Sequence, residues 1–441
     1  QLTKDEGAEL PLASTVLSRQ IYIDNCLFGA DSREEILKIR EEMKTLLNRG
    51  KFQLRKWASN SASLNEDIDA TDHGLAIEKP FREDDSLKIL GILWVPAQDT
   101  YRYHIQPFEN SIVTKRSVLS VIARLYDPLG WVSPVIIVAK VFMQKLWMNS
   151  VSWYETLPQE LSDVWQSYCE ELLILRQCSI PRWTGQGFEV MCSTIQGFSD
   201  ASNTAYAAVV YLRLVLPSGE IQITLLSSKT KVAPLKTLSI PRLELSGALL
   251  LTQLVSVIRS NPEFRTLNAL FWTDSTIVLA WLKKHPSSWS IFLENRVASI
   301  QSVAPIESWG HVSSEDNPAD LASRGAKPSE LMENKLWWKG PWWLSQSRNL
   351  WPDSQTLFDS DTTEEVRENA HCVTEVRCTW FDRLTSRVSS WLKLLKIVAY
   401  VLKFLALRRL SNRKKQDSES DSSLSEYCSE AEGVCVRLVH G

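Results

Sequence analysis

Four acidic residues are the side chains of this sequence that are best placed to do chemistry. Each stands beside an apolar run, and they are Asp200 in GFSDAS, Glu244 in IPRLELSGALL, Asp274 in FWTDSTIVLAWL and Asp320 in DNPADLASRG. They lie too far apart along the chain to form a local motif, so only a folded sheet could bring them together. Carboxylate oxygens are the ligands that Mg²⁺ prefers in proteins. We therefore expect the four residues to converge at one edge of a sheet and to hold divalent metal.

Hydrolysis of a phosphodiester is the chemistry that such a group of carboxylates would support. The reaction needs an in-line water, a stabilised leaving oxygen and neutralised phosphate charge, which two Mg²⁺ or Mn²⁺ ions about 4 Å apart provide. Carboxylates packed together repel one another, and the repulsion raises their pKa values until metal binds. We expect Asp200 to bridge both ions. Glu244 and Asp274 would bind one ion with it, and Asp320 would bind the other.

Each of the four residues also has a purely structural interpretation. Asp200 could start a turn, and Asp274 could cap the helix that follows it. Glu244 and Asp320 could be first-turn acids that complement a helix dipole. It is their occurrence together, in a suitable order of elements, that favours the metal site.

The elements that must position these acids can be predicted from hydrophobic periodicity and from cap and turn residues. Strands are expected at residues 189–200, 204–214, 220–228, 268–273 and 306–312. Helices are expected at residues 241–259, 275–284 and 288–303, followed by a short helix that Asn317 caps. Three strands followed by alternating helices and strands are the layout of RNase H. We therefore predict an α/β fold with an RNase H-like five-stranded mixed sheet and flanking helices.

The first part of the chain is predicted to mix short strands with helices. Alternating apolar and polar residues predict a hairpin at 18–28, and short apolar runs predict strands at 52–57 and 87–95. A helix is expected at 32–48, with Ser32 as its cap. Helical patterns follow in two stretches, at residues 116–147 and 153–183.

Three segments in the first hundred residues resemble the end of a reverse-transcriptase palm in their order and wording. They are YIDN at residues 22–25, FQLRKWASN at 52–60 and LKILGILW at 87–94. The stretch RSVLSVIARLYDPLGWVSPVIIVAKVFMQKLW at 116–147 resembles the thumb or connection of BEL/Pao-type LTR retrotransposon Pol polyproteins. The segments that carry Glu244, Asp274 and Asp320 share the wording of that family, so the chain resembles a Pol fragment.

The resemblance implies six parts, with a partial α+β palm and a helical connection ahead of the RNase H-like sheet. These are the partial reverse-transcriptase palm (1–110), the thumb or connection (111–185), the RNase H-like domain (186–330), a Trp-rich segment with an acidic linker (331–378), a helical lead-in to a missing integrase (379–410) and a disordered tail (411–441). The cluster WWKGPWWL at 337–344 could stack on nucleic acid, but we expect it to dock against the RNase H-like domain.

The resemblance also implies a ribonuclease that hydrolyses the RNA strand of RNA–DNA hybrids. Such a domain would sense the 2′-hydroxyls of that strand. Contacts to nucleic acid are expected from Lys229, Lys231, Lys236, Ser202, Asn203, Ser275 and Arg324. Arg324 could equally pair with an acid. His311 could act as a mobile catalytic base, although it falls in a predicted strand.

The palm-like part departs from the polymerase pattern at its hairpin. Where the family has a second aspartate, this sequence has Asn25, which leaves Asp24 as the one hairpin carboxylate. A neutral amide cannot supply the charge that a hard cation selects, so reverse-transcriptase activity is expected to be lost. Two alternatives to an active ribonuclease stay open: a degenerate, non-catalytic remnant that binds nucleic acid, and a polymerase part completed by another chain.

The composition is that of a globular protein, with 44% hydrophobic and 23% charged residues. A net charge of −3 gives no overall attraction to nucleic acid, so a binding groove must be local. No segment predicts a transmembrane helix, and no membrane partner is expected. The chain starts at Gln1, and we expect it to be a piece of a longer product. Its expected partners are an RNA–DNA hybrid and the missing reverse-transcriptase and integrase parts, and its expected location is the cytoplasm, retrotransposon particles or the nucleus.

Overall fold

The computed structural model describes residues 1–22, 25–64, 66, 68–69, 72, 87–89, 92–108, 112–187, 189–352, 387–388, 390–412 and 424–440. The chain divides into a large unit, residues 1–367, and a small unit, residues 368–441. Each unit has a hydrophobic core of its own, and all four acids lie in the large unit.

A five-stranded mixed sheet forms the centre of the large unit. Its strands are β7 (Cys192–Ala201), β8 (Ala205–Val215), β9 (Ile221–Val232), β10 (Asn268–Thr273) and β11 (Trp309–His311). They lie in the order β11-β10-β7-β8-β9. The first three pair antiparallel, whereas β10 runs parallel to β7 and β11 runs parallel to β10. The predicted α/β fold with a five-stranded mixed sheet is therefore confirmed.

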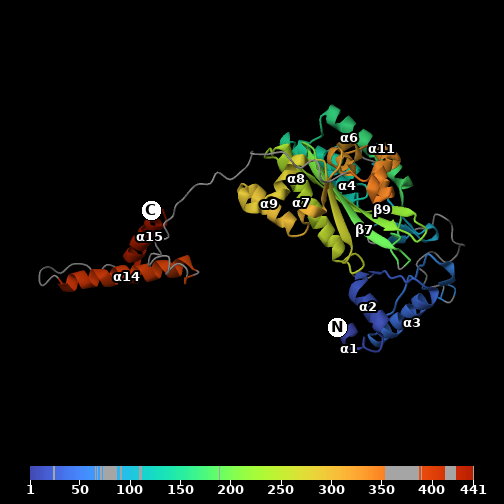
Figure 1. Ribbon diagram of the computed structural model, residues 1–441, viewed down its shortest axis with the longest axis horizontal. Coiled ribbons are helices and arrows are strands. Elements are labelled where there is room, and N and C mark those ends of the chain that lie inside the picture. Colours follow the sequence, from blue (N-terminus) through green and yellow to red (C-terminus); the bar gives the residue numbers. More distant parts are fainter. Residues whose placement is uncertain are drawn as a thin grey trace. The chain divides into compact units, whose positions relative to one another are not determined.

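Three helices cover one face of this sheet, and Figure 1 shows them grouped together. They are α7 (Ile240–Arg259), α8 (Thr276–Lys283) and α9 (Ile291–Gln301). Their apolar side chains share a core with Ile195, Val210 and Leu212 of the sheet. Gly247 allows α7 to approach β7 closely, because a Cβ at this position would lie 2.9 Å from the backbone oxygen of Asp200.

The opposite face is covered by helices that precede the sheet along the chain and by helices that follow it. They are α5 (Ser133–Met148), α10 (Pro318–Arg324) and α12 (Lys335–Lys339), with α4 (Lys115–Arg124), α6 (Gln159–Glu171) and α11 (Pro328–Glu333) packed nearby. Trp337 and Trp343 are fully buried there. The Trp337 indole donates a hydrogen bond to the backbone oxygen of Trp131 at 2.8 Å. The expectation that the WWKGPWWL cluster docks on the RNase H-like sheet is confirmed.

The hydrophobic core is continuous across the predicted boundary between connection and RNase H-like domain. Val118 and Val135 from the helical stretch share it with Phe198 and Tyr211 from the sheet. The sheet face opposite α7 therefore shares its core with the helical stretch. The division of the chain into six parts stays a prediction.

A turn of sequence DPLG, between α4 and α5, packs against the edge strand β9. The partly buried Asp127 carboxylate accepts hydrogen bonds from the backbone N–H groups of Trp131 and Val132, at 3.0 and 2.9 Å. Gly130 has a φ of 77°, and a Cβ there would lie 2.0 Å from the backbone oxygen of Ser228. Only glycine meets both demands, so this turn fixes α5 against the sheet.

The N-terminal residues form a small helical layer with its own core of Ala13, Val16, Met43 and Leu46. Its elements are α1 (Leu2–Asp5), α2 (Pro11–Arg19), β1 (Ile21–Tyr22), β2 (Asn25–Cys26) and α3 (Arg33–Arg49). The expected hairpin is present as β1 and β2. The expected helix is present as α3, and the Ser32 hydroxyl accepts a hydrogen bond from the Glu35 N–H at 3.2 Å.

Two strand predictions in this region are wrong. Residues 52–57 form no strand, and Lys51 and Lys56 take left-handed φ values of 60° and 58° that interrupt an extended chain. The run 87–95 is not one strand but two, β3 (Leu87–Ile89) and β4 (Ile92–Val95), which pair antiparallel. They join β5 (Thr100–Arg102) and β6 (Ser179–Pro181) in a four-stranded sheet.

The small unit contains two helices, α14 (Trp391–Asn412) and α15 (Leu424–His440). Leu394 and Val398 of α14 pack against Ala431 and Cys435 of α15. The predicted lead-in helix is present as α14, and residues 379–386 of that prediction lie outside the described residues. The helix α15 differs from the disorder expected for the tail, because apolar residues at positions 431 and 435 recur one helical turn apart and give it a face to bury.

Within the described residues, α7 is the one helix long and apolar enough to cross a membrane, by length and composition alone. Half of it is buried inside the protein. Its apolar surface is explained by the sheet that it covers.

The close approach of α7 to β7 gives a first prediction. Replacing Gly247 with Ala should lower the free energy of unfolding by about 1–3 kcal/mol, as overpacking does in a well-packed core. Urea unfolding of the whole chain measures this effect. Gly187→Ala is the matched control, because a Cβ at Gly187 meets no atom within 4 Å. Equal stability of the two variants would show that the approach of α7 is not constrained at Gly247.

Candidate active site

Two of the four predicted acids emerge from neighbouring parallel strands. Thr273 of β10 pairs with Ser199 of β7, and Asp274 and Asp200 follow these residues directly. Since parallel strands carry the same end of the chain to the same edge, the two carboxyl groups leave the sheet together. Asp200 is only 5% exposed.

Glu244 reaches the same edge from the helix α7. It is the fifth residue of that helix and lies beyond the first turn, which weakens its interpretation as a first-turn acid. Burial raises the pKa of the Glu244 carboxyl group, and the nearby Ser275 hydroxyl lowers it. The Ser275 hydroxyl accepts a hydrogen bond from the Val278 N–H at 3.1 Å. Ser275 rather than Asp274 is therefore the cap of α8.

Asp320 approaches from the opposite face, on the short helix α10. Its Oδ1 lies 2.5 Å from the Nε of Arg324 in an ion pair, and its side chain is 30% exposed. Asn317 caps this helix as expected, since its Oδ1 accepts a hydrogen bond from the Ala319 N–H at 3.1 Å. The pairing of Arg324 with an acid, one of its two expected roles, is thereby observed.

The pKa values show that these carboxyl groups lie close enough to repel one another. Burial, followed by the charges of Asp274 and Asp320, raises the pKa of Asp200 to about 7, against a hydrogen bond from Ser323 that lowers it. Burial and the charge of Asp274 also raise the pKa of Glu244. The structure thus brings all four predicted acids into one electrostatic group.

Three polar residues around α10 hold the two strand-end aspartates, and the sequence analysis gave none of them this role. The Ser314 hydroxyl donates to Asp274 Oδ2 at 2.7 Å. The Asn317 amide donates to Asp274 Oδ1 at 3.3 Å and to the backbone oxygen of Ser199 at 3.1 Å. The Ser323 hydroxyl donates to Asp200 Oδ2. Their clustering in the stretch that contains Asp320 was the one available signal.

The donor set suits a hard divalent cation held by few protein ligands. Among the described residues, no group of three or more His, Cys, Asp or Glu side chains is placed to hold one ion. Mg²⁺ is commonly held by one or two carboxylates and completes its shell with water and substrate phosphates. A buried carboxyl group whose pKa is raised by its neighbours is also a group that a cation would stabilise. The residues therefore fit Mg²⁺ or Mn²⁺ through pairs of carboxylates.

The predicted nucleic-acid contacts fall into two groups. Lys229, Lys231, Lys236 and Asn203 are exposed. Across β8, Lys229 and Lys231 of β9 are in register with the end of β7 that carries Asp200. Ser202, Ser275 and Arg324 already contact protein groups. Nucleic-acid binding by all seven residues stays a prediction.

His311 lies on β11, as its sequence setting predicted. Its Nε2 is 3.2 Å from the backbone oxygen of Asp274. This contact places the imidazole beside the acidic group, while its role as a base stays a prediction. Asp24 of the predicted polymerase hairpin lies outside the described residues, and Asn25 belongs to β2.

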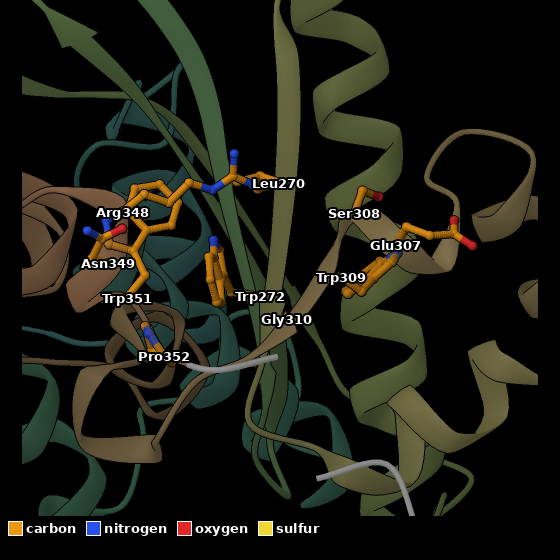
Figure 2. Close-up of a pocket in the computed structure, with 10 residues that line it drawn as sticks. All are labelled: Leu270, Trp272, Glu307, Ser308, Trp309, Gly310, Arg348, Asn349, Trp351 and Pro352. Atoms are coloured by element: carbon orange, nitrogen blue, oxygen red, sulfur yellow. The ribbon is translucent and has the colours of Figure 1, made fainter. Parts of the chain in front are cut away.

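A cavity at β10 and β11 is separate from the acids. It has a volume of about 420 Å³ and is lined by residues of β10, β11 and the segment that follows Trp343. Figure 2 shows Arg348 and Trp351 on one side of it and Glu307 and Trp309 on the other. None of the four acids lines it. The cavity is therefore no part of the acidic group.

The fold and the acidic group define an RNase H-like domain. Residues 114–275 match the family model described as Pao retrotransposon-like RNaseH-like domain. The match supports a Pao-type retrotransposon RNase H domain in this part of the chain. It runs from the cap of α4 to the cap of α8, so it includes the helical stretch as well as the sheet.

One solved structure is also similar to part of the chain. It is the crystal structure of RNase H1 from the halophilic archaeon Halobacterium salinarum NRC-1, with 13% sequence identity over 32% of this chain and 97% of that chain, and a TM-score of 0.18. No curated protein shows a significant sequence match to the chain. The reverse-transcriptase palm at residues 1–110 stays a prediction.

The raised pKa of Asp200 predicts how stability depends on pH. In the unfolded chain this group titrates near about 3.9, whereas in the folded, metal-free protein its pKa is about 7. Ionisation is thus disfavoured by folding, and the stability contributed by the neutral form is lost as the pH rises from about 4 to about 7. Asp200→Asn removes this loss. Its gain in stability over the unaltered protein should be larger at pH 8 than at pH 5 by at least about 1 kcal/mol.

Urea unfolding in EDTA at the two pH values measures this difference. Asp163→Asn, at an exposed position of α6, is the matched control and should show no such change. A gain for Asp200→Asn that is equal at pH 5 and pH 8 would contradict the raised pKa.

Proposed function

We propose that this chain carries a metal-dependent ribonuclease that hydrolyses the RNA strand of RNA–DNA hybrids. The observation that supports it most is the buried Asp200 carboxyl group, whose pKa is raised by Asp274 and Asp320 at the end of an RNase H-like sheet. A purely structural role would not require three carboxylates to repel one another at a sheet edge. A divalent cation would offset the repulsion between these carboxylates.

Asp200, Glu244, Asp274 and Asp320 would share in holding the divalent ions, through pairs of carboxylates rather than through one group of three. When bound, the ions supply an activated water and neutralise charge on the leaving oxygen. Ser314 and Asn317 hold the Asp274 carboxylate in place. The chain itself thus supplies orientation and negative charge at fixed points.

Recognition of the hybrid would come from exposed lysines of the edge strand β9. Lys229 and Lys231 lie on β9, in register with the end of β7 that carries Asp200. Their charges suit the phosphates of a backbone, and such contacts position a duplex without reading its sequence. Selection of RNA over DNA at the cleaved strand would depend on its 2′-hydroxyl groups. The partner is therefore an RNA–DNA hybrid.

A cleavage assay tests the proposal. The whole chain is incubated with a labelled RNA–DNA hybrid and Mg²⁺ or Mn²⁺, beside Asp274→Asn and the exposed control Asp163→Asn. Loss of a carboxylate that binds metal directly should lower the rate by more than about 100-fold, because even outer residues of metal sites cost 10–100-fold. The control should keep the full rate. Equal cleavage by the Asp274 variant, or no cleavage by any of the three proteins, rules out the proposal.

A non-catalytic remnant that binds nucleic acid is the second candidate. The observation that favours it is the ion pair between Arg324 and Asp320, which already neutralises one of the four acids. Asn25 in the predicted polymerase hairpin also favours a non-catalytic remnant, because it replaces an acid. Hybrid binding without metal-dependent turnover would select this function. A primer-extension assay with the missing polymerase parts would test the third interpretation, that of a polymerase completed by another chain.

A further inference from the structure

The Ser323 hydroxyl contacts the Asp200 carboxylate and the backbone of Asp320. Ser323 is on α10, three residues after Asp320, and is only 1% exposed. Its hydroxyl donates to Asp200 Oδ2 and also lies 3.1 Å from the backbone oxygen of Asp320. Among the described residues, it is the one side chain that donates to the Asp200 carboxylate.

The backbone of Ser323 is itself fixed to the strand that carries Asp200. Its carbonyl oxygen accepts a hydrogen bond from the Ser202 hydroxyl at 2.7 Å. The oxygen of that hydroxyl accepts in turn from the Thr204 and Ala205 N–H groups, at 3.3 and 3.2 Å, in the turn between β7 and β8. The turn that directly follows Asp200 therefore sets the position of Ser323.

A second anchor holds the other side of the same helix. The N–H of Ala326, just after α10, donates to the backbone oxygen of Pro134 in α5 at 3.0 Å. Gly325 between them has a φ of 86°, and a Cβ there would lie 2.6 Å from the Val138 side chain. Ser323 can therefore move little relative to β7.

Such a donor matters because the carboxyl torsion of aspartate is broad and lacks a strongly preferred angle. Without a fixed donor, the buried Asp200 carboxylate could rotate and present its oxygens in several directions. The hydrogen bond occupies one lone pair of Oδ2. A carboxylate oxygen that accepts one hydrogen bond keeps a second lone pair.

Resting on the proposed function, we propose that Ser323 is a positioning residue that fixes the plane of the Asp200 carboxylate for two divalent cations. It does not itself bind metal or substrate. Outer residues of this kind change metal affinity by about 10–100-fold. Ser323 thereby couples the position of α10, and with it Asp320, to the orientation of Asp200.

Binding of Mn²⁺ alone tests the proposal without hydrolysis. Free Mn²⁺ is measured by electron paramagnetic resonance during titration of the whole chain, for the unaltered protein, Ser323→Ala and Ser227→Ala. Ser227 is the matched control, since it is a buried serine whose hydroxyl donates to the backbone oxygen of Leu129 at 2.8 Å. The Ser323 variant should bind about tenfold more weakly. The control should bind within about twofold of the unaltered protein, inside the scatter of such measurements.

Two further variants keep the test decisive. Ser323→Thr retains the hydroxyl and should restore most of the affinity. If Ser323→Ala does not fold, Ser323→Cys replaces it, because a thiol has similar size and is a weak donor. Unchanged Mn²⁺ affinity in a folded Ala or Cys variant overturns the proposal.

The cleavage assay separates this proposal from the proposed function. If the unaltered protein binds Mn²⁺ and the Ser323 variant binds it more weakly, the positioning role holds even where no hybrid is cleaved. If hybrid is cleaved and the Ser323 variant needs no more metal than the unaltered protein, only the positioning role fails.

Discussion

Burial of the Asp200 carboxyl group beside α10 removes the water that would otherwise solvate its charge. Two further carboxyl groups, on Asp274 and Asp320, add repulsion to this desolvation, and the pKa of Asp200 rises to about 7. Folding alone gains nothing from the arrangement, because an isolated buried charge is among the most unfavourable features a protein can hold. The packing of α7, β7, β10 and α10 is what keeps these groups together.

The short helix α10, which carries Asp320, is held in place by several other elements of the molecule. It has seven residues, too few to be stable alone in water. Bonds from Ser202 and Asn317 tie it to β7, and the backbone after Gly325 ties it to α5. Since α5 is fixed in turn by the DPLG turn against β9, the helical stretch before the sheet helps to define the acidic site. The family match from residue 114 is consistent with this shared packing.

Local pattern predicted the elements of the sheet well, because each strand lies between clear turns or caps. The strand at 268–273 has the predicted bounds, and Asp200 lies near enough to Asp274 and Asp320 for their charges to raise its pKa further, after burial. Sequence patterns failed to predict the strands where a few backbone angles decide whether a run stays extended or turns back. The apolar run 87–95 could not reveal that Ile89 pairs back onto Ile92. The roles of Ser314 and Ser323 also escaped prediction, since a hydroxyl becomes a donor to a particular carboxylate only through tertiary contacts.

Proton release on metal binding is the most direct test of the central claim that the four acids form one site for divalent cations. Calorimetric titration of the whole chain with Mg²⁺ at pH 7, in buffers of different ionisation enthalpy, counts the protons released. A raised pKa at Asp200 predicts that binding displaces a substantial fraction of one proton, because the metal requires the ionised carboxylate. The release should fall toward zero at pH 9 and disappear in Asp200→Asn. Binding without proton release at pH 7, or no binding at all, would contradict the account.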